Sequence, residues 1–317
     1  MSRIIVTGGS GFIGSALIRH LINNTKHKVM NIDKLTYASN QKSLNEIKSH
    51  NNYIFKKIDI CSHSKIKNVF KSYRPNIIIN LAAESHVDNS IKNSTEFIKT
   101  NIFGTYNLLE RSREYLSTLA NLDKKKFRFH HVSTDEVYGD LGSKKKLFTE
   151  QNAYQPSSPY SASKASSDHL VRSWFRTYNL PITISNCSNN YGPYQHDEKL
   201  IPIIIKNALN QNKIPIYGKG IQIRDWLYVD DHVKAIIEIV FKGKIGETYN
   251  IGGNNLIKNI DIVKHIFKYL NIYETKNNLP ITNYKNLVTY VKDRPGHDFK
   301  YGINNTKITN ELKWKPQ

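Results

Sequence analysis

The sequence predicts an α/β protein, in which helices cover both faces of a doubly wound parallel sheet and a smaller, mixed α/β C-terminal lobe packs beside it. Three observations support this prediction. Strand-like and helix-like stretches alternate through the first two thirds of the chain, a glycine-rich turn joins the first strand to the first helix, and the last third is less regular. A chain of 317 residues is also long enough to bury a full core and to form two lobes.

Short apolar runs rich in β-branched residues define the strands expected in the first two thirds. These runs lie at Ile4–Thr7, Lys28–Asp33, Tyr53–Asp59, Asn76–Ala82, Phe127–Ser133 and Ile182–Asn186. Helical patterns separate most of them, at Phe12–Asn23, Ser62–Ser72, Thr95 to about Leu116, and Tyr160–Tyr178. Such alternation is typical of parallel strands connected by helices on the two faces of a sheet.

The last third has short β segments between helices, at Ile214–Tyr217, Asp225–Val229 and Thr248–Ile251. We therefore predict a dinucleotide-binding domain over residues 1–187, which a returning segment at about 225–250 joins. Residues 188–224 and 251–317 form the predicted substrate lobe.

The formal charge of +20 comes from 46 basic and 26 acidic residues, and the lysines are spread along the chain. The densest run, Lys124–Lys126, precedes a strand and is expected to be a solvated loop. No nucleic-acid recognition motif accompanies the charge, so we expect no nucleic-acid partner, although a basic nucleic-acid binder stays an open alternative.

The chain is expected to be cytoplasmic. No apolar run is long enough to cross a bilayer, and the first strand begins too early to leave room for a signal peptide. The two cysteines, Cys61 and Cys187, provide neither a disulfide framework nor a metal-ligand pattern. We therefore expect no membrane partner and no metal.

A glycine-rich loop, Gly8–Gly14, follows the first strand and opens the first helix. Gly8, Gly11 and Gly14 permit a tight turn, close approach to a pyrophosphate and close packing of helix on strand, which is the Rossmann pattern. Phe12 and Ile13 lie in the same loop, where free N–H groups at the helix start can bind the pyrophosphate.

Asp33 ends the second strand, where its carboxylate can accept hydrogen bonds from an adenosine ribose. The same carboxylate would repel a 2′-phosphate, so the sequence favours NAD over NADP. The alternative is that Asp33 is an ordinary turn former at the end of a strand. Asp59 and Ile60, which follow the third strand, are predicted to border the adenine.

Tyr160 and Lys164 are four residues apart at the start of a predicted helix and so share one face. A nearby ammonium stabilises a phenolate and lowers the pKa of the tyrosine, which suits removal of a proton from an alcohol. This spacing also arises by chance, but it gains weight behind a dinucleotide loop.

Thr134, Asp135 and Glu136 close the strand Phe127–Ser133 at the edge of the sheet where cofactor and substrate meet. Thr134 provides a hydroxyl donor. Two adjacent acids suit an elimination, in which one group removes a carbon-bound proton and the other protonates a departing hydroxyl. The alternative is that Asp135 and Glu136 are solvated loop acids.

Together these residues resemble the dTDP-glucose 4,6-dehydratase family over nearly the whole chain. The most specific segments are Thr134–Glu136 and Asp293–Asp298. Further segments that carry the resemblance are Asp33–Ala38, Leu81–Asp88, Thr100–Asn101, Ser188–Gln195, Lys199–Pro202 and Arg224–His232. Ser39 departs from the family, which usually has glycine there, and the chain stops at Gln317, where relatives continue through another helix.

The resemblance implies bound NAD and a nucleotide-sugar substrate, dTDP-glucose. Besides the residues named above, it assigns cofactor contacts to Lys34, Leu35, Thr36, Leu81, Ala82, Ala83, Glu84, Ser85, Thr100, Tyr160, Lys164 and Asn190. It assigns substrate contacts to Ser85, Thr134, Asn189, Lys199, Leu200, Pro215, Ile216, Tyr217, Arg224, Asn259, Arg294 and His297. Arg224 and Arg294 can bind a diphosphate, and Tyr217 can lie against a base.

The resemblance also implies a reaction. Tyr160, with Lys164, takes the proton of the sugar 4-hydroxyl while C4 is oxidised. Glu136 then removes the C5 hydrogen and Asp135 protonates the 6-hydroxyl, which leaves as water. The implied product is dTDP-4-keto-6-deoxyglucose, which usually feeds dTDP-rhamnose and other deoxysugars of cell-surface polysaccharides. Relatives pair the helices near Thr95–Leu116 and Tyr160–Tyr178 across a two-fold axis, so we also expect a homodimer.

Three alternatives stay open. A dehydratase acting on UDP- or GDP-sugars would use the same residues, because the sequence does not distinguish thymine from uracil. A nucleotide-sugar 4-epimerase would need no pair of acids at Asp135 and Glu136. A non-catalytic NAD-binding regulator would need neither these acids nor Tyr160 and Lys164.

Overall fold

The computed structural model describes all residues 1–317 and contains a seven-stranded sheet in which every pair of neighbouring strands is parallel. Its spatial order is β3-β2-β1-β4-β5-β6-β10. These strands are β1 (Arg3–Thr7), β2 (Lys28–Asp33), β3 (Tyr53–Lys57), β4 (Ile77–Asn80), β5 (Arg128–Thr134), β6 (Ile182–Cys187) and β10 (Thr248–Ile251). The order reverses direction at β1, so the predicted doubly wound sheet of the Rossmann type is confirmed.

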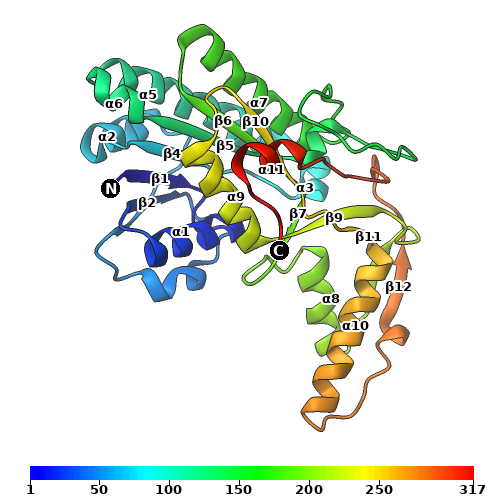
Figure 1. The fold of residues 1–317 in the computed structure, drawn as a ribbon. Helices are drawn as coiled ribbons and strands as arrows, with labels where there is room; N and C mark the ends of the chain where they lie inside the picture. The colour runs from blue at the N-terminus through cyan, green and yellow to red at the C-terminus, as the bar shows by residue number, and fades with distance from the viewer.

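Helices pack on both faces of this sheet, and each face has its own apolar core (Figure 1). Ile4 and Val6 of β1 belong to one core, whereas Ile5 between them belongs to the other. The first core is covered by α1 (Phe12–Asn24), the 3-10 helix η1 (Gln41–Ile47) and α9 (Val229–Lys242). The second is covered by α2 (His63–Tyr73), α5 (Thr105–Ser117) and α7 (Pro159–Tyr178). Burial on both faces explains why the strands are continuous apolar runs.

The start of α7 has the features that its sequence predicts. Ser158 and Ser161 form a reciprocal capping box, and Pro159 occupies the first turn, where its missing N–H costs nothing. The helix ends at Asn179, which adopts a left-handed conformation. This cap places Tyr160 and Lys164 in the first two turns.

The helix predicted from Thr95 to Leu116 is not regular. It consists of α4 (Thr95–Phe97), a π-helical segment η2 (Ile98–Gly104) and α5. At Gly104 a Cβ would lie 2.5 Å from Cδ1 of Ile60, so the segment packs closely against the loop after β3. The π turn shifts the register by a fraction of a turn, which a periodicity argument does not reveal.

Several other predicted boundaries are corrected. The strand predicted over Tyr53–Asp59 ends at Lys57, and the strand predicted over Asp225–Val229 is β9 (Ile223–Tyr228), because Val229 begins α9. The Lys124–Lys126 run is solvated as predicted but ends a short helix, α6 (Asn121–Lys126), rather than forming a loop. Two further short helices, α3 (Val87–Lys92) and the 3-10 helix η3 (Asp135–Tyr138), follow β4 and β5.

The later part of the chain forms a smaller mixed α/β unit. Its core lies between α8, α10 and a pair of strands, β8 and β12, and a second small sheet has the order β11-β9-β7. The elements are β7 (Asn189–Tyr191), α8 (Leu200–Leu209), β8 (Ile214–Tyr217), β11 (Leu256–Lys258), α10 (Asn259–Lys276), the 3-10 helix η4 (Tyr284–Leu287) and β12 (Val288–Val291). The chain returns to the main sheet through α9 and β10, where α11 (Thr306–Leu312) and Trp314 also pack. The division into two lobes at the stated boundaries stays a prediction.

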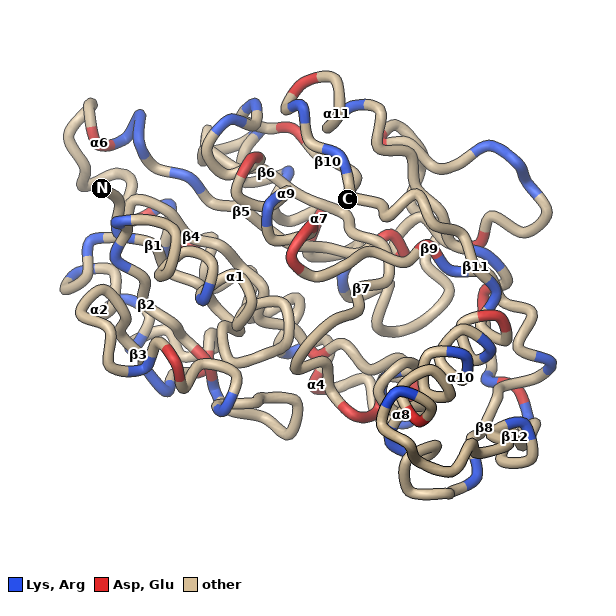
Figure 2. Tube along the Cα trace, turned by 60° about the horizontal axis from the view of Figure 1, so that its bottom comes forward, with Lys and Arg blue, Asp and Glu red and all other residues tan.

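Lys and Arg lie all around the trace and are interspersed with Asp and Glu (Figure 2). The net charge of +20 is therefore distributed over both units. None of the helices has the length and apolar character needed to span a membrane.

Candidate active site

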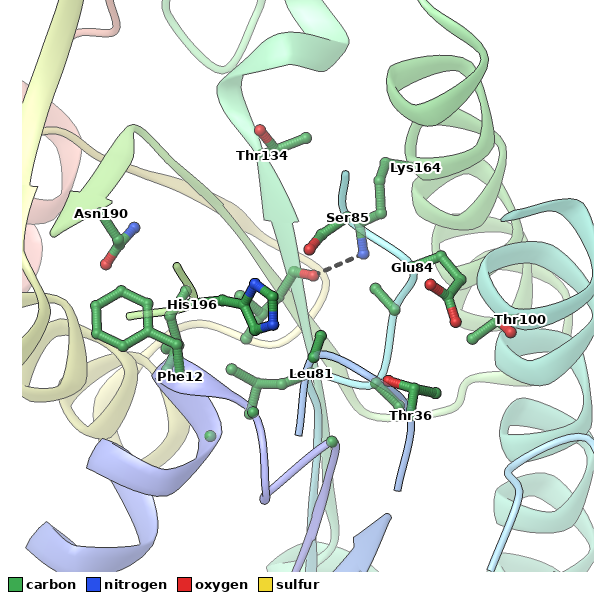
Figure 3. A pocket seen from close by; sticks show the side chains of 18 of the residues that line it. Phe12, Thr36, Leu81, Glu84, Ser85, Thr100, Thr134, Lys164, Asn190 and His196 are labelled. Carbon is green, nitrogen blue, oxygen red and sulfur yellow. Dashed lines mark hydrogen bonds between the residues drawn. The ribbon is translucent and has the colours of Figure 1, made fainter. Parts of the chain in front are cut away.

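A cavity of about 300 Å³ lies at the carboxyl ends of the parallel strands. Residues from the ends of β1, β2, β4, β5 and β6 line it, together with the start of α1, the first turns of α7 and the segment before α8. Figure 3 shows Phe12, Leu81, Thr134 and Lys164 around this space. This is the edge at which doubly wound sheets bind ligands.

The glycine loop lets its backbone come close to neighbouring backbone and to a bound ligand. Gly8 has a φ of +68°, and a Cβ there would lie 2.7 Å from the backbone of Ala82, so no other residue fits without a shift. At Gly14 a Cβ would lie 2.3 Å from the carbonyl oxygen of Gly8. Helix α1 begins at Phe12 with no side-chain cap, which leaves its first N–H groups free to bind an anion. The loop therefore fits the pyrophosphate of a dinucleotide.

Asp33 lies beside this loop and is buried, with 7% of its surface exposed. One carboxylate oxygen accepts the backbone N–H of Ser10 at 2.9 Å, and the other accepts that of Leu35 at 2.7 Å and the hydroxyl of Ser39 at 3.1 Å. Asp33 thus both fixes the turn and faces the cavity. Ser39, which departs from the family pattern, adds one of these hydrogen bonds and lines the cavity itself.

Nearly all of the residues predicted to contact the cofactor line this one cavity. They are Gly8, Gly11, Phe12, Ile13, Gly14, Asp33, Lys34, Thr36, Asp59, Ile60, Leu81, Ala82, Ala83, Glu84, Ser85, Thr100, Tyr160, Lys164 and Asn190. Leu35 does not line it; this residue has a φ of +60° and serves the turn through its backbone N–H.

The loop after β4 is held from the π-helical segment. Asn101 accepts the N–H of Glu84 at 2.9 Å and donates to its carbonyl at 3.0 Å, and it also donates to the hydroxyl of Ser163 at 2.8 Å. Lys34 donates to the hydroxyl of Thr100 at 3.0 Å and lies 3.4 Å from the carboxylate of Glu84. Asn101, which was named only as part of a segment that carries the resemblance, is therefore a positioning residue.

Lys164 extends from α7 towards β5, where its ammonium donates to the carbonyl oxygen of Val132 at 2.8 Å (Figure 3). Tyr160 is buried on the same helix face. Burial raises the pKa of Tyr160 well above its usual value, Glu136 raises it further, and a hydrogen bond with Thr134 opposes them. The predicted lowering of this pKa is therefore wrong, because desolvation in the closed cavity is the largest influence and the opposing group is Thr134.

Asp135 and Glu136 occupy the 3-10 turn η3 after β5, and the side chain of Thr134 caps this turn. Only 2% of Asp135 is exposed, and one of its carboxyl oxygens has no hydrogen-bond partner. Burial raises the pKa of Asp135 well above its usual value, and the negative charges of Glu136 and Asp225 raise it further. The alternative of a solvated loop acid is thus wrong for Asp135.

Glu136 has a different environment. Burial also raises its pKa, but the positive charges of Arg224, Lys199 and Arg294 oppose the shift. Asp135 is therefore the member of the pair that keeps its proton, and Glu136 is the member that loses it first. Two neighbouring carboxyls with separated pKa values are the arrangement that an acid and a base require.

The residues predicted to bind substrate divide into two groups. Ser85, Thr134, Asn189 and Lys199 line the cavity, and Lys199 donates to the carbonyl of Ser85 at 3.1 Å. The others lie outside the cavity, on the small unit or its connections: Leu200, Pro215, Ile216, Tyr217, Arg224, Asn259, Arg294 and His297.

Several side chains in this second group already have partners. Arg224 is buried, donates to the backbone carbonyls of Ile223 and Asp298, and lies over the ring of Tyr301. Arg294 lies 3.3 Å from Asp88 and over the ring of Tyr217. Ile216 is buried in the core of the small unit, and His297 bonds Asp293 at 2.6 Å. Contact with a substrate at these positions stays a prediction.

Several residues that line the cavity were not predicted. They are Ile32, Ala38, Ser39, Ile58, Val132, Ser133, Cys187, Ser188, Gln195, His196 and Glu198. Burial raises the pKa of Cys187 to about 12, so this thiol stays protonated. His232 of α9 is fully buried and bonds the side-chain oxygen of Asn190 at 2.8 Å, which orients that residue. No local pattern in the sequence connects two residues 42 positions apart.

The chain is similar to known proteins over its whole length. A family model described as GDP-mannose 4,6 dehydratase matches residues 5–317. The dTDP-glucose 4,6-dehydratase of Haemophilus influenzae is 55% identical over 317 residues, which cover 100% of this chain and 94% of the relative.

Two solved structures are also similar. The dTDP-glucose 4,6-dehydratase of Bacillus anthracis in complex with NAD has a TM-score of 0.86 and 40% identity, covering 100% of this chain and 92% of that one. DesIV, a dTDP-glucose 4,6-dehydratase from Streptomyces venezuelae with NAD and TYD bound, has a TM-score of 0.89 and 37% identity, covering 99% and 92%.

The raised pKa of Asp135 predicts how the stability of the protein depends on pH. The folded state keeps a proton on Asp135 above pH 3.8, where an unfolded chain loses it, so this residue makes stability fall as the pH rises. Asp135→Asn cannot titrate. The stability of wild type should therefore fall more steeply with rising pH above 3.8 than that of Asp135→Asn in urea unfolding. Parallel pH profiles would show that Asp135 ionises normally.

Proposed function

Because this chain belongs to the GDP-mannose 4,6-dehydratase family and, within it, to the dTDP-glucose 4,6-dehydratases, we propose that it converts dTDP-glucose into dTDP-4-keto-6-deoxyglucose and water. It is an NAD-dependent hydro-lyase. The observation that carries the proposal is the pair of buried Asp135 and partly buried Glu136 beside Tyr160 and Lys164, in a cavity that a dinucleotide loop closes at the other end.

The residues present fit NAD. The uncapped start of α1 and the glycine loop would hold its pyrophosphate, and Asp33 would face the adenosine ribose. Tyr160, Lys164 and the loop Ala82–Ser85 would border the nicotinamide end. When bound, NAD supplies a hydride acceptor for C4 of the sugar and a hydride donor for C6.

Tyr160 acts as the base that takes the proton of the sugar 4-hydroxyl. Burial raises the pKa of its phenol, and the hydrogen bond with Thr134 opposes that shift. The ammonium of Lys164, on the same helix face, is proposed to favour the phenolate as well. Thr134 holds the same sugar hydroxyl in reach of Tyr160. The ketone that forms at C4 acidifies the hydrogen at C5.

Glu136 then removes the C5 proton, because the nearby cations favour its ionised form while Asp135 holds its proton. Asp135, which keeps its proton, delivers it to the 6-hydroxyl, and this group leaves as water. Glu136 later returns a proton to C5. Over one turnover Tyr160 gains one proton and Asp135 loses one. Tyr160 then releases its proton to solvent and Asp135 takes one up, which restores the starting protonation states.

The alternatives account for less of the site. A 4-epimerase uses the tyrosine and lysine but needs neither Asp135 nor Glu136. Enclosing these two acids without a function would cost free energy. A dehydratase of UDP- or GDP-sugars would share every residue of the cavity. The base of the nucleotide is therefore decided by experiment, with Tyr217, Arg224 and Arg294 as the proposed contacts on the small unit.

We also propose that the protein is a homodimer in the cytoplasm and that its product feeds cell-surface polysaccharide synthesis through deoxysugars. Exposed apolar side chains on η2 and α5 support the dimer, including Phe103 with 62% of its surface exposed and Ile98 with 52%. Tyr106 of α5 lies edge-on to Trp174 of α7, so the two helices share this face. A monomer in light scattering at micromolar concentration would contradict the proposed seam.

The proposed function predicts which nucleotide sugar is consumed. Incubated with dTDP-glucose, UDP-glucose and GDP-mannose, the protein should dehydrate dTDP-glucose with the highest kcat/KM, seen as alkaline absorbance of a 4-keto sugar and loss of one water by mass spectrometry. Equal or faster dehydration of another sugar would overturn the nucleotide assignment. A hexose epimerised without loss of water would overturn the dehydratase assignment.

The roles of Tyr160 and Glu136 predict failure at different steps. Tyr160→Phe should prevent oxidation of C4, so no absorbance of reduced cofactor develops after rapid mixing. Glu136→Gln should still oxidise C4 but lose turnover by about two to four powers of ten, because a placed base is missing. In heavy water the wild-type product should carry deuterium at C5. Glu46→Gln, an exposed glutamate ion-paired with Arg19, is the control and should behave as wild type. Normal turnover of Glu136→Gln would remove the basis for the elimination.

The charge of Asp33 predicts a preference for NAD over NADP. Asp33→Asn keeps an acceptor oxygen for the turn but removes the charge that would face a 2′-phosphate. The dissociation constant for NADP should therefore move closer to that for NAD. Calorimetric titration of both cofactors measures this ratio, and the melting temperature shows whether the turn survives. Equal affinities in the unmutated protein would show that Asp33 serves the turn alone.

A further inference from the structure

We propose that Asp168 is a positioning residue that keeps Lys164 charged and extended towards the active site from behind it. Asp168 lies one helical turn after Lys164 on α7, is fully buried and does not line the cavity. It therefore cannot touch a substrate and can act only through a neighbour. This inference rests on the proposed function to the extent that Lys164 assists Tyr160.

The sequence places four polar residues on one stripe of α7. Tyr160, Lys164, Asp168 and Arg172 follow each other at intervals of four, so they share one face of the helix. The first two meet the cavity, and the last two are behind it. An acidic residue thus lies between two cations in the interior of the protein.

The carboxylate of Asp168 is held by hydrogen bonds on one side. Its first oxygen accepts the hydroxyl of Tyr154 at 2.9 Å, and the oxygen of that hydroxyl in turn accepts from Arg172 at 2.7 Å. The amide of Asn186 lies 3.4 Å away. The second oxygen has no hydrogen-bond partner and faces Nε2 of His131 at 3.4 Å. Nζ of Lys164 lies 3.3 Å from the same Nε2, so one ring nitrogen neighbours both the free oxygen and the ammonium.

The hydrogen-bond pattern around His131 fixes its tautomer. Thr7 donates its hydroxyl to the side-chain oxygen of Asn80 at 2.6 Å, so the amide nitrogen of Asn80 is the atom 3.1 Å from Nδ1 of His131. This amide can only donate, so Nδ1 accepts and the ring hydrogen is on Nε2, towards Asp168. Burial holds the pKa of His131 well below its usual value, so the ring is neutral.

Lys164 consequently has one carboxyl group, that of Asp168, within this buried group; burial raises the pKa of Asp168, and the charges of Lys164 and Arg172 oppose that shift. The Nζ of Lys164 lies 3.3 Å from Nε2 of His131, but that nitrogen carries a hydrogen, and the hydrogen bond goes to the carbonyl of Val132. Cys187 of β6 is the other titratable group that favours the ammonium, and its thiol is protonated. Burial lowers the pKa of Lys164, and Asp168 is the largest group that raises it.

Two physical consequences follow if the carboxylate is removed. Lys164 should lose its proton at lower pH, because burial lowers its pKa and the largest opposing influence, Asp168, is then missing. Without the ammonium, the phenol of Tyr160 should become harder to ionise, so the acid limb of the pH profile should move to higher pH. The competing interpretation is that Asp168 is only the structural partner of Tyr154 and Arg172.

The test compares Asp168→Asn, which keeps the shape and removes the charge, with wild type and with Asp231→Asn. Asp231 is a matched control, since it is a buried helical carboxylate that lies 3.4 Å from a lysine, Lys234, outside the cavity. Acetic anhydride labels only unprotonated amines, so mass spectrometry of Lys164 labelling against pH reports its protonation without any substrate. The labelling midpoint should move to lower pH in Asp168→Asn and stay unchanged in Asp231→Asn. An unchanged midpoint in Asp168→Asn would overturn the proposal.

A double-mutant cycle then tests whether the effect passes through Lys164. At pH 7, Asp168→Asn should lower kcat/KM by about tenfold for each unit by which the acid limb moves. Adding Asp168→Asn to Lys164→Met should cause no further loss, because the group it acts on is gone. A full additional loss would assign Asp168 a structural role instead. If no nucleotide sugar reacts but the labelling midpoint still moves, the proposed function fails while the role of Asp168 stands.

Discussion

The constraint on which the rest of the site depends is the burial of two adjacent carboxyl groups at the end of β5. Removing a carboxylate from water is costly, so a buried acid either keeps its proton or is offset by nearby positive charge. Asp135 takes the first course, because it is almost fully enclosed and has a second acid beside it. Glu136 takes the second, because Arg224, Lys199 and Arg294 face it from the small unit. The different surroundings of the two carboxyl groups therefore separate their pKa values, and with them the roles of acid and base.

The carboxyl-terminal edge of the parallel sheet is where the fold brings the site residues together. Parallel strands end together, so the glycine loop after β1, the turn after β2 and the acids after β5 meet in one cavity. The π-helical segment η2 contributes Asn101, which holds the loop after β4 in place against α7. The small unit closes the other side with cations. The positive charges of Arg224, Lys199 and Arg294 thus offset part of the cost of placing two acids there.

Much of this could be predicted from local patterns. Strand runs, the glycine loop, Asp33 and the spacing of Tyr160 and Lys164 are all local in sequence. In the structure the glycine loop, Asp33, Tyr160 and Lys164 line one cavity. What could not be predicted depends on contacts between distant segments. Examples are the bond from His232 to Asn190, the inward turn of Arg224, and the π turn that packs Gly104 on Ile60. The direction of the pKa of Tyr160 was wrong because desolvation is a property of the closed cavity and not of a motif.

The central claim is that Asp135 is a neutral acid beside a Glu136 that loses its proton first, and infrared spectroscopy at neutral pH tests it most directly. The wild-type spectrum minus that of Asp135→Asn should contain the carbonyl stretch of a protonated carboxyl group. The same stretch should persist in Glu136→Gln, because the amide that replaces Glu136 does not remove the burial of Asp135. A difference spectrum with only the bands of an ionised carboxylate would contradict the account.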